Sequence, residues 1–216
     1  MKRPLCIYCG LRTGDTRDHA PPKCFFGSER PPNAITVPCC EACRRAGEKN
    51  ETTIRNLLIS FDQTETHPTV QSSLLGKRDR SFRHSVSEVR KLMAMMVDVD
   101  IISPGGIYLG RDKGFNLNQL LVHSFIERMS RALLYEEFQE PYFNGDFGWV
   151  LNPPMPDAVT SWMKDKLPGR EMSNVFYYRI TNQHATEPWW ITMIFYGKVR
   201  VLARVRKGRA RIVDGG

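Results

Sequence analysis

The chain has no long hydrophobic run, so a helix that spans a membrane is not expected. Such a helix needs roughly 18 or more consecutive apolar residues, and no stretch of this sequence approaches that length. In the basic start, residues 1–4, polar residues interrupt the chain before any apolar segment typical of a signal peptide forms. We therefore expect a cytoplasmic protein without a membrane partner.

Several sequence patterns that carry chemistry are also missing. The chain has no internal repeat, no glycine-rich loop of the kind that binds phosphates, and no Ser-His-Asp arrangement. Solenoid architectures, P-loop nucleotide binding and serine-hydrolase chemistry are therefore not expected.

Acidic residues are fewer than basic ones, 23 against 31, so the net charge is +8. An excess of this size favours a polyanionic partner such as nucleic acid, because each neutralised phosphate releases condensed counterions. A charge that only keeps the protein soluble would produce the same composition. Charge alone therefore leaves both interpretations open.

Cysteine is absent after residue 43, and four of the six cysteines form two Cys-x-x-Cys pairs. In a reducing compartment, two such pairs separated by about thirty residues predict a structural zinc site with four thiolate ligands. Cys39 offers an alternative to Cys40, but only Cys40 repeats the spacing of the first pair. Cys24 has no spaced partner and is expected to be a buried or loop thiol. The predicted zinc ligands are Cys6, Cys9, Cys40 and Cys43.

Two short strands and a helix are expected around these cysteines. Residues 16–20 have strand character and are followed by two prolines, which cannot donate to a β-ladder. Residues 33–38 alternate between apolar and polar side chains, as a second strand does. The second cysteine pair then opens a helix. The expected order is therefore strand, strand, helix.

This arrangement resembles the HNH (ββα-metal) endonucleases, with Asp18 and His19 in the first strand and Asn33 at the second. Segments 16–23 and 32–40 are similar to a bacterial group of small HNH proteins, and the resemblance is faint beyond about residue 55. It implies a nuclease, that is, a hydrolase acting on phosphodiester bonds, with DNA rather than RNA as the expected substrate. A role in defence against foreign DNA fits such relatives, although no residue here indicates it.

The resemblance and the chemistry of hydrolysis assign roles to the polar residues. His19 is predicted to activate water, because an imidazole group titrates near neutral pH. Asp18 is predicted to bind Mg²⁺ or Mn²⁺, since these ions prefer oxygen ligands. The resemblance gives Asn33 the role of tying the loop backbone together and orienting His19.

One position departs from the family pattern. The residue after the last zinc cysteine is usually Asn or His in such proteins and completes the metal site, but here it is Arg44, which cannot bind a cation. Glu48, one helical turn further on, is the predicted replacement ligand, with Asn50 and Glu51 as further candidates. Alternatively, Arg44 contacts the phosphate itself, or the module is catalytically inactive and binds nucleic acid or protein.

Basic residues near the predicted site are expected to contact nucleic acid. They are Lys23, Arg44, Arg45 and Lys49. Arg128 and Arg131, further along the chain, are expected to face either solvent or nucleic acid. A homo-oligomer or a protein partner remains open.

The predicted fold class is α+β in three parts. They are a zinc-bound, treble-clef-like ββα-metal module (1–62), a helical body with a β-hairpin (63–140), and a C-terminal β-rich region with an antiparallel sheet (141–216). The basic run 77–84 is expected to be a solvated loop or a phosphate contact, and His67 an exposed loop residue. Asp98 and Asp100 are expected to face solvent.

The last predicted strand, residues 198–206, has two different faces. Alternation places apolar side chains on one face and basic ones on the other. The basic face either holds a nucleic-acid backbone or protects a sheet edge from aggregation. The predicted apolar face consists of Val199, Val201, Ala203 and Val205.

Overall fold

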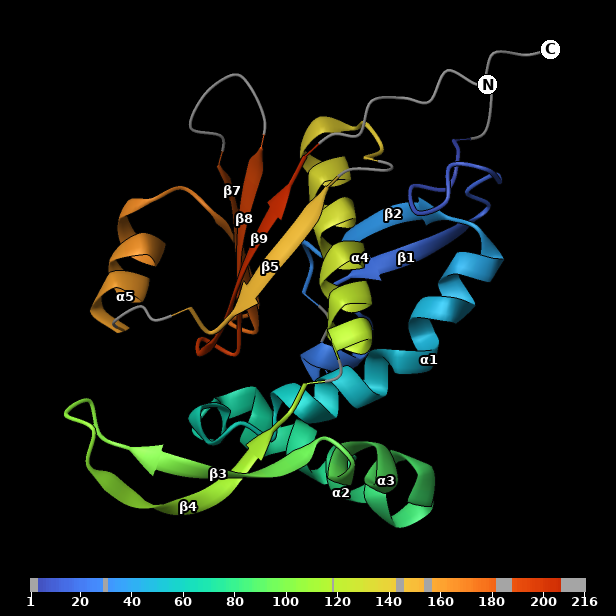
Figure 1. Ribbon diagram of the computed structural model, residues 1–216. Helices are drawn as coiled ribbons and strands as arrows, with labels where there is room; N and C mark the ends of the chain where they lie inside the picture. The colour runs from blue at the N-terminus through green and yellow to red at the C-terminus, as the bar shows by residue number, and fades with distance from the viewer. Residues whose placement is uncertain are drawn as a thin grey trace.

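The computed structural model describes residues 4–28, 31–117, 119–142, 146–153, 157–181 and 188–206. Within these ranges the fold is α+β, as predicted, with a C-terminal antiparallel sheet (Figure 1). None of the helices in these ranges is long and apolar enough to cross a membrane.

The N-terminal part forms the predicted strand-strand-helix unit. Strand β1 (Thr16–Ala20) pairs antiparallel with β2 (Ile35–Cys39), and helix α1 (Glu41–Leu58) follows at once. Glu41 lies in the first turn of α1, where a carboxylate is favoured by the helix dipole. The end of α1 buries Ile54, Leu57 and Leu58. Between the strands lies a short 3-10 helix, η1 (Lys23–Phe26).

The basic run 77–84, predicted as a loop, is helical. It belongs to α2 (Leu75–His84), which continues a π-helical turn, η3 (Val70–Leu74). Lysine and arginine are good helix formers, and Phe82 packs against the core, so charge density alone was a poor indicator of a loop. The remaining helices of this part are η2 (Asp62–Thr64) and α3 (Val86–Met93).

His67 is half-buried rather than exposed as predicted. Its Nε2 lies 3.1 Å from the carbonyl oxygen of Asn174, and its ring contacts the Tyr196 ring edge-on at 5.5 Å. The loop is therefore held against the C-terminal sheet. Burial lowers the pKa of His67.

Strands β3 (Met96–Ile102) and β4 (Tyr108–Phe115) form a separate two-stranded hairpin, which we call the β arm. Every residue of β3 is exposed. Asp98 and Asp100 face solvent, as predicted, and pair across the hairpin with Lys113 and Arg111. Figure 1 shows the β arm extending away from the C-terminal sheet.

The C-terminal sheet has the strand order β5-β9-β8-β7-β6 and is antiparallel throughout. Helix α4 (Gln119–Phe138) covers one face, and α5 (Asp157–Lys166) lies on the other side (Figure 1). The predicted apolar face of the last strand is buried, and Arg200, Leu202 and Arg204 alternate with it. The strands are β5 (Phe147–Leu151), β6 (Arg170–Met172), β7 (Phe176–Thr181), β8 (Trp189–Phe195) and β9 (Val199–Val205).

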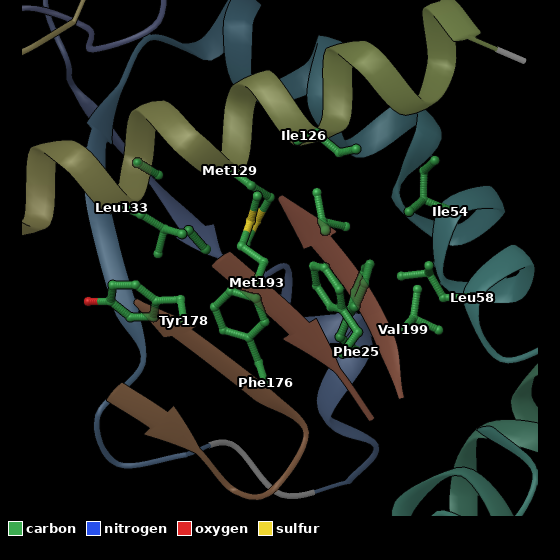
Figure 2. Close-up of a cluster of buried hydrophobic side chains, with 14 of the residues drawn as sticks. Phe25, Ile54, Leu58, Ile126, Met129, Leu133, Phe176, Tyr178, Met193 and Val199 are labelled. Atoms are coloured by element: carbon green, nitrogen blue, oxygen red, sulfur yellow. The ribbon is translucent and has the colours of Figure 1, made fainter. Parts of the chain in front are cut away.

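The largest hydrophobic core runs through all three predicted parts of the chain. Helix α4 forms a shared wall, since Ile126 and Met129 are buried in one cluster with Ile54 of α1 and Met193 of β8 (Figure 2). Phe25, from η1, stacks on Phe125 of α4 with ring centroids 5.6 Å apart. The N-terminal unit is thus packed onto the rest of the molecule, and the three-part division stays a prediction.

Candidate metal centre and adjoining cavity

The four predicted cysteine ligands come together. The sulfur atoms of Cys6, Cys9, Cys40 and Cys43 all lie within 4.8 Å of one another and could hold a metal ion. Cys39 is not among them, because its thiol donates to the carbonyl oxygen of Cys40 at 3.3 Å. Four sulfur ligands complete a tetrahedral site and leave no position for a substrate. In the ranges that the structure describes, no other group of acidic, histidine or cysteine side chains is arranged this way.

The backbone around the first cysteine pair forms a tight turn whose hydrogen bonds favour the thiolate form of Cys9. Gly10 adopts a left-handed conformation with φ 66°, and its amide donates to the carbonyl oxygen of Cys6 at 2.9 Å. Burial alone would raise the pKa of Cys9, but hydrogen bonds from the backbone of Leu11 and Arg12 lower it to about 6. Thiolate, the form that binds metal, is therefore favoured here.

The two remaining cysteines behave differently. Burial raises the pKa of both Cys24 and Cys39 to about 12. Cys24 therefore remains a protonated thiol; it is half-buried and lies in the 3-10 helix η1, rather than in the loop or fully buried position that was predicted.

A cavity of about 310 Å³ lies beside the metal centre, between β1, α1 and α4. It brings together Asp18 and His19, as predicted, with two residues of α1, Asn50 and Glu51. Helix α4 adds two arginines that the sequence left open between solvent and nucleic acid. The polar lining residues are Tyr8, Asp18, His19, Asn50, Glu51, Ser124, Glu127, Arg128 and Arg131.

Asp18 is buried, with 6% of its surface exposed, and it already has two partners on one oxygen. The Tyr8 hydroxyl donates to its Oδ2 at 2.6 Å, and Nη2 of Arg128 lies 2.7 Å from the same atom. The second contact is an ion pair rather than an aligned hydrogen bond, since Nη2 has no partner with hydrogen-bond geometry among the described residues. Burial, followed by the charge of Asp18, raises the pKa of Tyr8, which therefore stays a donor.

Arg128 is held by three further features. Its Nη1 donates to the carbonyl oxygen of Cys43 at 2.8 Å, and its guanidinium lies over the Tyr8 ring at 4.0 Å. Gly47 of α1 makes room for it, because a Cβ there would lie 2.5 Å from the guanidinium carbon. Arg131 acts in parallel: its Nη1 donates to the carbonyl oxygen of Tyr8 at 2.8 Å and its Nη2 pairs with Glu127. The two arginines of α4 thereby bind the backbone at both cysteine pairs, at Tyr8 in the first turn and at Cys43 in α1.

Glu51 is an unusual carboxyl group in this cavity. Burial, and then the negative charge of Asp18, raises its pKa to about 7, although the positive charge of Arg128 opposes the shift. At neutral pH Glu51 is therefore protonated in a substantial fraction of molecules.

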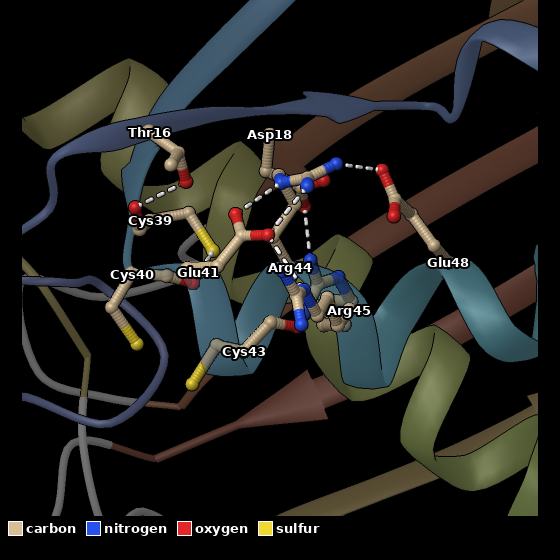
Figure 3. A network of polar contacts seen from close by, with 10 residues as sticks. Thr16, Asp18, Cys39, Cys40, Glu41, Cys43, Arg44, Arg45 and Glu48 are labelled. Atoms are coloured by element: carbon tan, nitrogen blue, oxygen red, sulfur yellow. Dashed lines mark hydrogen bonds and ion pairs between the residues drawn. The ribbon is translucent and has the colours of Figure 1, made fainter.

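Arg44 and Glu48 pair with each other on the surface of α1. Arg44 donates to both carboxylate oxygens of Glu41 at 2.8 Å and also to Glu48, and Arg45 donates to Glu41 at 2.7 Å (Figure 3). These arginines hold the pKa of Glu41 down to about 2. Glu48, the predicted replacement ligand, does not line the cavity, and Glu51 takes its place there.

Asn33 does not line the cavity either. Its side-chain amide donates to the carbonyl oxygen of Glu171 on β6 at 2.8 Å, which ties the entry to β2 to the C-terminal sheet. Of the other predicted contacts, Lys23 and Lys49 are exposed, and the Arg45 side chain is 75% exposed. Arg45 also pairs with Glu41, and Arg44 is engaged by two carboxylates.

The predicted Mg²⁺ or Mn²⁺ ion can be tested against these donors. A divalent ion needs several oxygen ligands with surplus negative charge, but Oδ2 of Asp18 is shared by Tyr8 and Arg128. The donor set in this arrangement does not fit such an ion.

Comparison with known proteins found no matching family model, no similar curated protein and no similar solved structure. The relation to HNH endonucleases therefore rests on the resemblance of the N-terminal motifs.

Proposed function

We propose that the chain is an HNH-like endonuclease that hydrolyses phosphodiester bonds, with DNA as the favoured substrate. The observation that carries this proposal is the shared cavity: His19 lines it together with Glu51 and two arginines of α4. A general base, a proton donor and fixed positive charge are the groups that phosphodiester hydrolysis needs.

The four-cysteine centre is proposed to hold structural zinc. Its sulfur ligands suit this ion, and a closed set of four supports folding rather than chemistry. A bound metal would fix the turn that carries Tyr8 and the start of α1 that carries Cys43, whose carbonyl oxygens accept hydrogen bonds from Arg131 and Arg128.

The proposed reaction uses residues of the cavity in turn. His19 takes a proton from a water molecule while the water oxygen forms a bond to phosphorus. The bond from phosphorus to the leaving sugar oxygen breaks, and protonated Glu51 supplies the proton that this oxygen needs. Arg128 and Arg131, which both line the cavity, are the groups proposed to meet the negative charge that builds up on the phosphate.

A second candidate function is supported by the surroundings of Asp18. A carboxylate that is neutralised by an arginine and a tyrosine is satisfied without substrate or metal. This favours a catalytically inactive module that keeps the fold and binds nucleic acid through its basic surface.

Cleavage of a supercoiled plasmid distinguishes the two functions. The wild-type chain is expected to nick the plasmid, and His19→Ala is expected to lower the rate by about 100-fold or more, as the loss of a general base does. His84→Ala is the matched control, because His84 is exposed at the end of α2. Zinc content and circular dichroism verify that each variant is folded.

A wild-type chain that binds DNA in a salt-dependent manner but never cleaves it would establish the inactive module instead. Parallel assays on RNA of the same sequence determine which nucleic acid is the substrate.

A further inference from the structure

The position beside Asp18 is occupied by a cation that belongs to the chain itself. Arg128 lies 2.7 Å from the carboxylate of Asp18, and its side chain is only 18% exposed. A buried carboxylate needs a compensating positive charge, because desolvation disfavours its ionised form. The guanidinium group provides this charge permanently, since it does not lose its proton in proteins.

Several contacts from different parts of the chain fix the position of the Arg128 side chain, so its pairing with Asp18 is not a chance contact of a surface residue. The Tyr8 ring comes from the turn of the first cysteine pair, and the Cys43 carbonyl oxygen and the gap at Gly47 both come from α1. Each of these features fits a guanidinium group, and a mid-helix glycine in α1 carries a helix-propensity cost. The sequence therefore gives up helix stability at the place where Arg128 enters.

The balance of charges around the cavity leaves little attraction for a divalent ion. Arg128 opposes Asp18, and Arg131 pairs with Glu127. Glu51, with its raised pKa, carries only part of a negative charge near neutral pH. Glu48 and Arg44, the other charged groups near Glu51, pair with each other. A site for Mg²⁺ or Mn²⁺ would need a surplus of negative charge.

We propose that Arg128 takes the position that a catalytic divalent cation holds in a ββα-metal site, so that the cavity works without Mg²⁺ or Mn²⁺. The part of this proposal that concerns cleavage rests on the proposed nuclease function. The part that concerns metal binding stands on the Asp18–Arg128 pair alone.

Binding of Mn²⁺ tests the proposal without any activity assay. The zinc-loaded wild-type chain is titrated with Mn²⁺ and followed by electron paramagnetic resonance. No site tighter than roughly 0.1 mM is expected, which is weaker than dedicated oxygen-ligand sites. Arg128→Met leaves Asp18 and Glu51 without their cation and is expected to gain Mn²⁺ affinity. Arg90→Met, an exposed position on α3, is the control that should behave as wild type.

Asp18→Asn provides an independent test of Mn²⁺ binding if Arg128→Met does not fold. Tight Mn²⁺ binding by the wild-type chain that Asp18→Asn abolishes would overturn the proposal, since the carboxylate would then be a metal ligand. Absence of tight binding in both proteins supports it.

Plasmid cleavage supplies the second measurement. The zinc-loaded chain, in buffer freed of other divalent ions, is expected to cleave at a rate that added Mg²⁺ or Mn²⁺ changes by less than about threefold. Arg128→Met is expected to cleave about 100-fold more slowly, as after loss of one charge-stabilising group. Cleavage that requires Mg²⁺ or Mn²⁺ would overturn the proposal and leave the nuclease function intact. No cleavage under either condition counts against the nuclease function, and the Mn²⁺ titration still decides the role of Arg128.

Discussion

Glu51 is a residue whose surroundings make the stability of the protein depend on pH. Its pKa rises from 4.5 to about 7 on folding, mainly because it is buried. Between about pH 4.5 and 7 the native state therefore keeps a proton that the unfolded chain has already released near pH 4.5. The contribution of Glu51 to stability is fully present below this window and is lost as the pH rises through about 7.

We expect Glu51→Gln to remove this dependence, since an amide has the shape of a protonated carboxyl group and does not ionise. At pH 8 the variant should be more stable than the wild type by up to about 3 kcal/mol, the equivalent of the pKa shift. At pH 5 the two proteins should differ little. Urea unfolding of both proteins at each pH measures this, and an equal difference at pH 5 and pH 8 would contradict the raised pKa.

Cys39 and Cys40 are neighbours with different roles, and substitution separates them. Cys40→Ser removes one of four sulfur ligands and is expected to lose zinc and much of the stability of the N-terminal unit. Cys39→Ser should keep one zinc per chain, at a cost of about 1 kcal/mol for placing a hydroxyl in a buried site. Metal analysis and thermal unfolding provide the readouts. Equal zinc loss in both variants would show that the ligand set includes Cys39.

At the scale of elements, helices α1 and α4 are in close contact at Gly47. The guanidinium of Arg128 fills the space where a side chain on α1 would lie. This contact explains why a residue of low helix propensity stands in the middle of α1.

Gly47→Ala should destabilise the protein by a net of about 1 to 2 kcal/mol, because crowding of Arg128 outweighs the gain in helix propensity. Gly76→Ala in α2 is the matched control, since a Cβ there meets nothing within 4 Å. The control should gain roughly 0.5 to 1 kcal/mol. A stabilised Gly47→Ala variant would show that Arg128 moves aside at no cost.

Local patterns of the sequence were sufficient for some elements of the fold and of the site. The spacing of the cysteine pairs identified the four cysteines that come together, and the alternation in β9 identified its buried face. Both patterns are short in sequence and follow directly from backbone periodicity. The ββα order followed from the two prolines and the second cysteine pair.

Long-range pairings could not be predicted in this way. Asp18 and Arg128 are joined by tertiary packing of α4 against β1, and nothing near Arg128 in the sequence distinguishes it from a surface arginine. Asn33 likewise acquires its partner from β6, far along the chain. Two residues gave a hint in the sequence: Gly47, a glycine inside a predicted helix, and Tyr8, an aromatic residue between two cysteines. Neither residue indicates that its contact is Arg128.

At the scale of the whole molecule, the main core joins all three parts of the chain, and the β arm reaches it through Phe115 of β4, whose ring lies 5.9 Å from that of Phe61. Within the described residues the β3 and β4 strands pair with each other and with no other strand, and the β3 side chains are exposed. An isolated two-stranded hairpin is marginally stable in water.

Amide hydrogens of β3 and β4 are therefore expected to exchange at least about 100-fold faster than those of β8 in the middle of the C-terminal sheet. Hydrogen–deuterium exchange measured at two protein concentrations tests this. Strong protection of the arm at both concentrations would contradict the expectation, and protection that grows with concentration would identify a second copy as its cover.

The hydrogen bonds from Arg128 and Arg131 to the backbone at the two cysteine pairs create a thermodynamic linkage between the candidate metal centre and the cavity. A compound that binds the cavity only when both arginines are in place must increase the affinity of the centre for its metal. The metal must increase the affinity of the cavity for that compound by the same factor, because coupling of this kind is reciprocal. Binding of a compound in the cavity would thus be detectable at the metal centre, as slower transfer of zinc to a chelator.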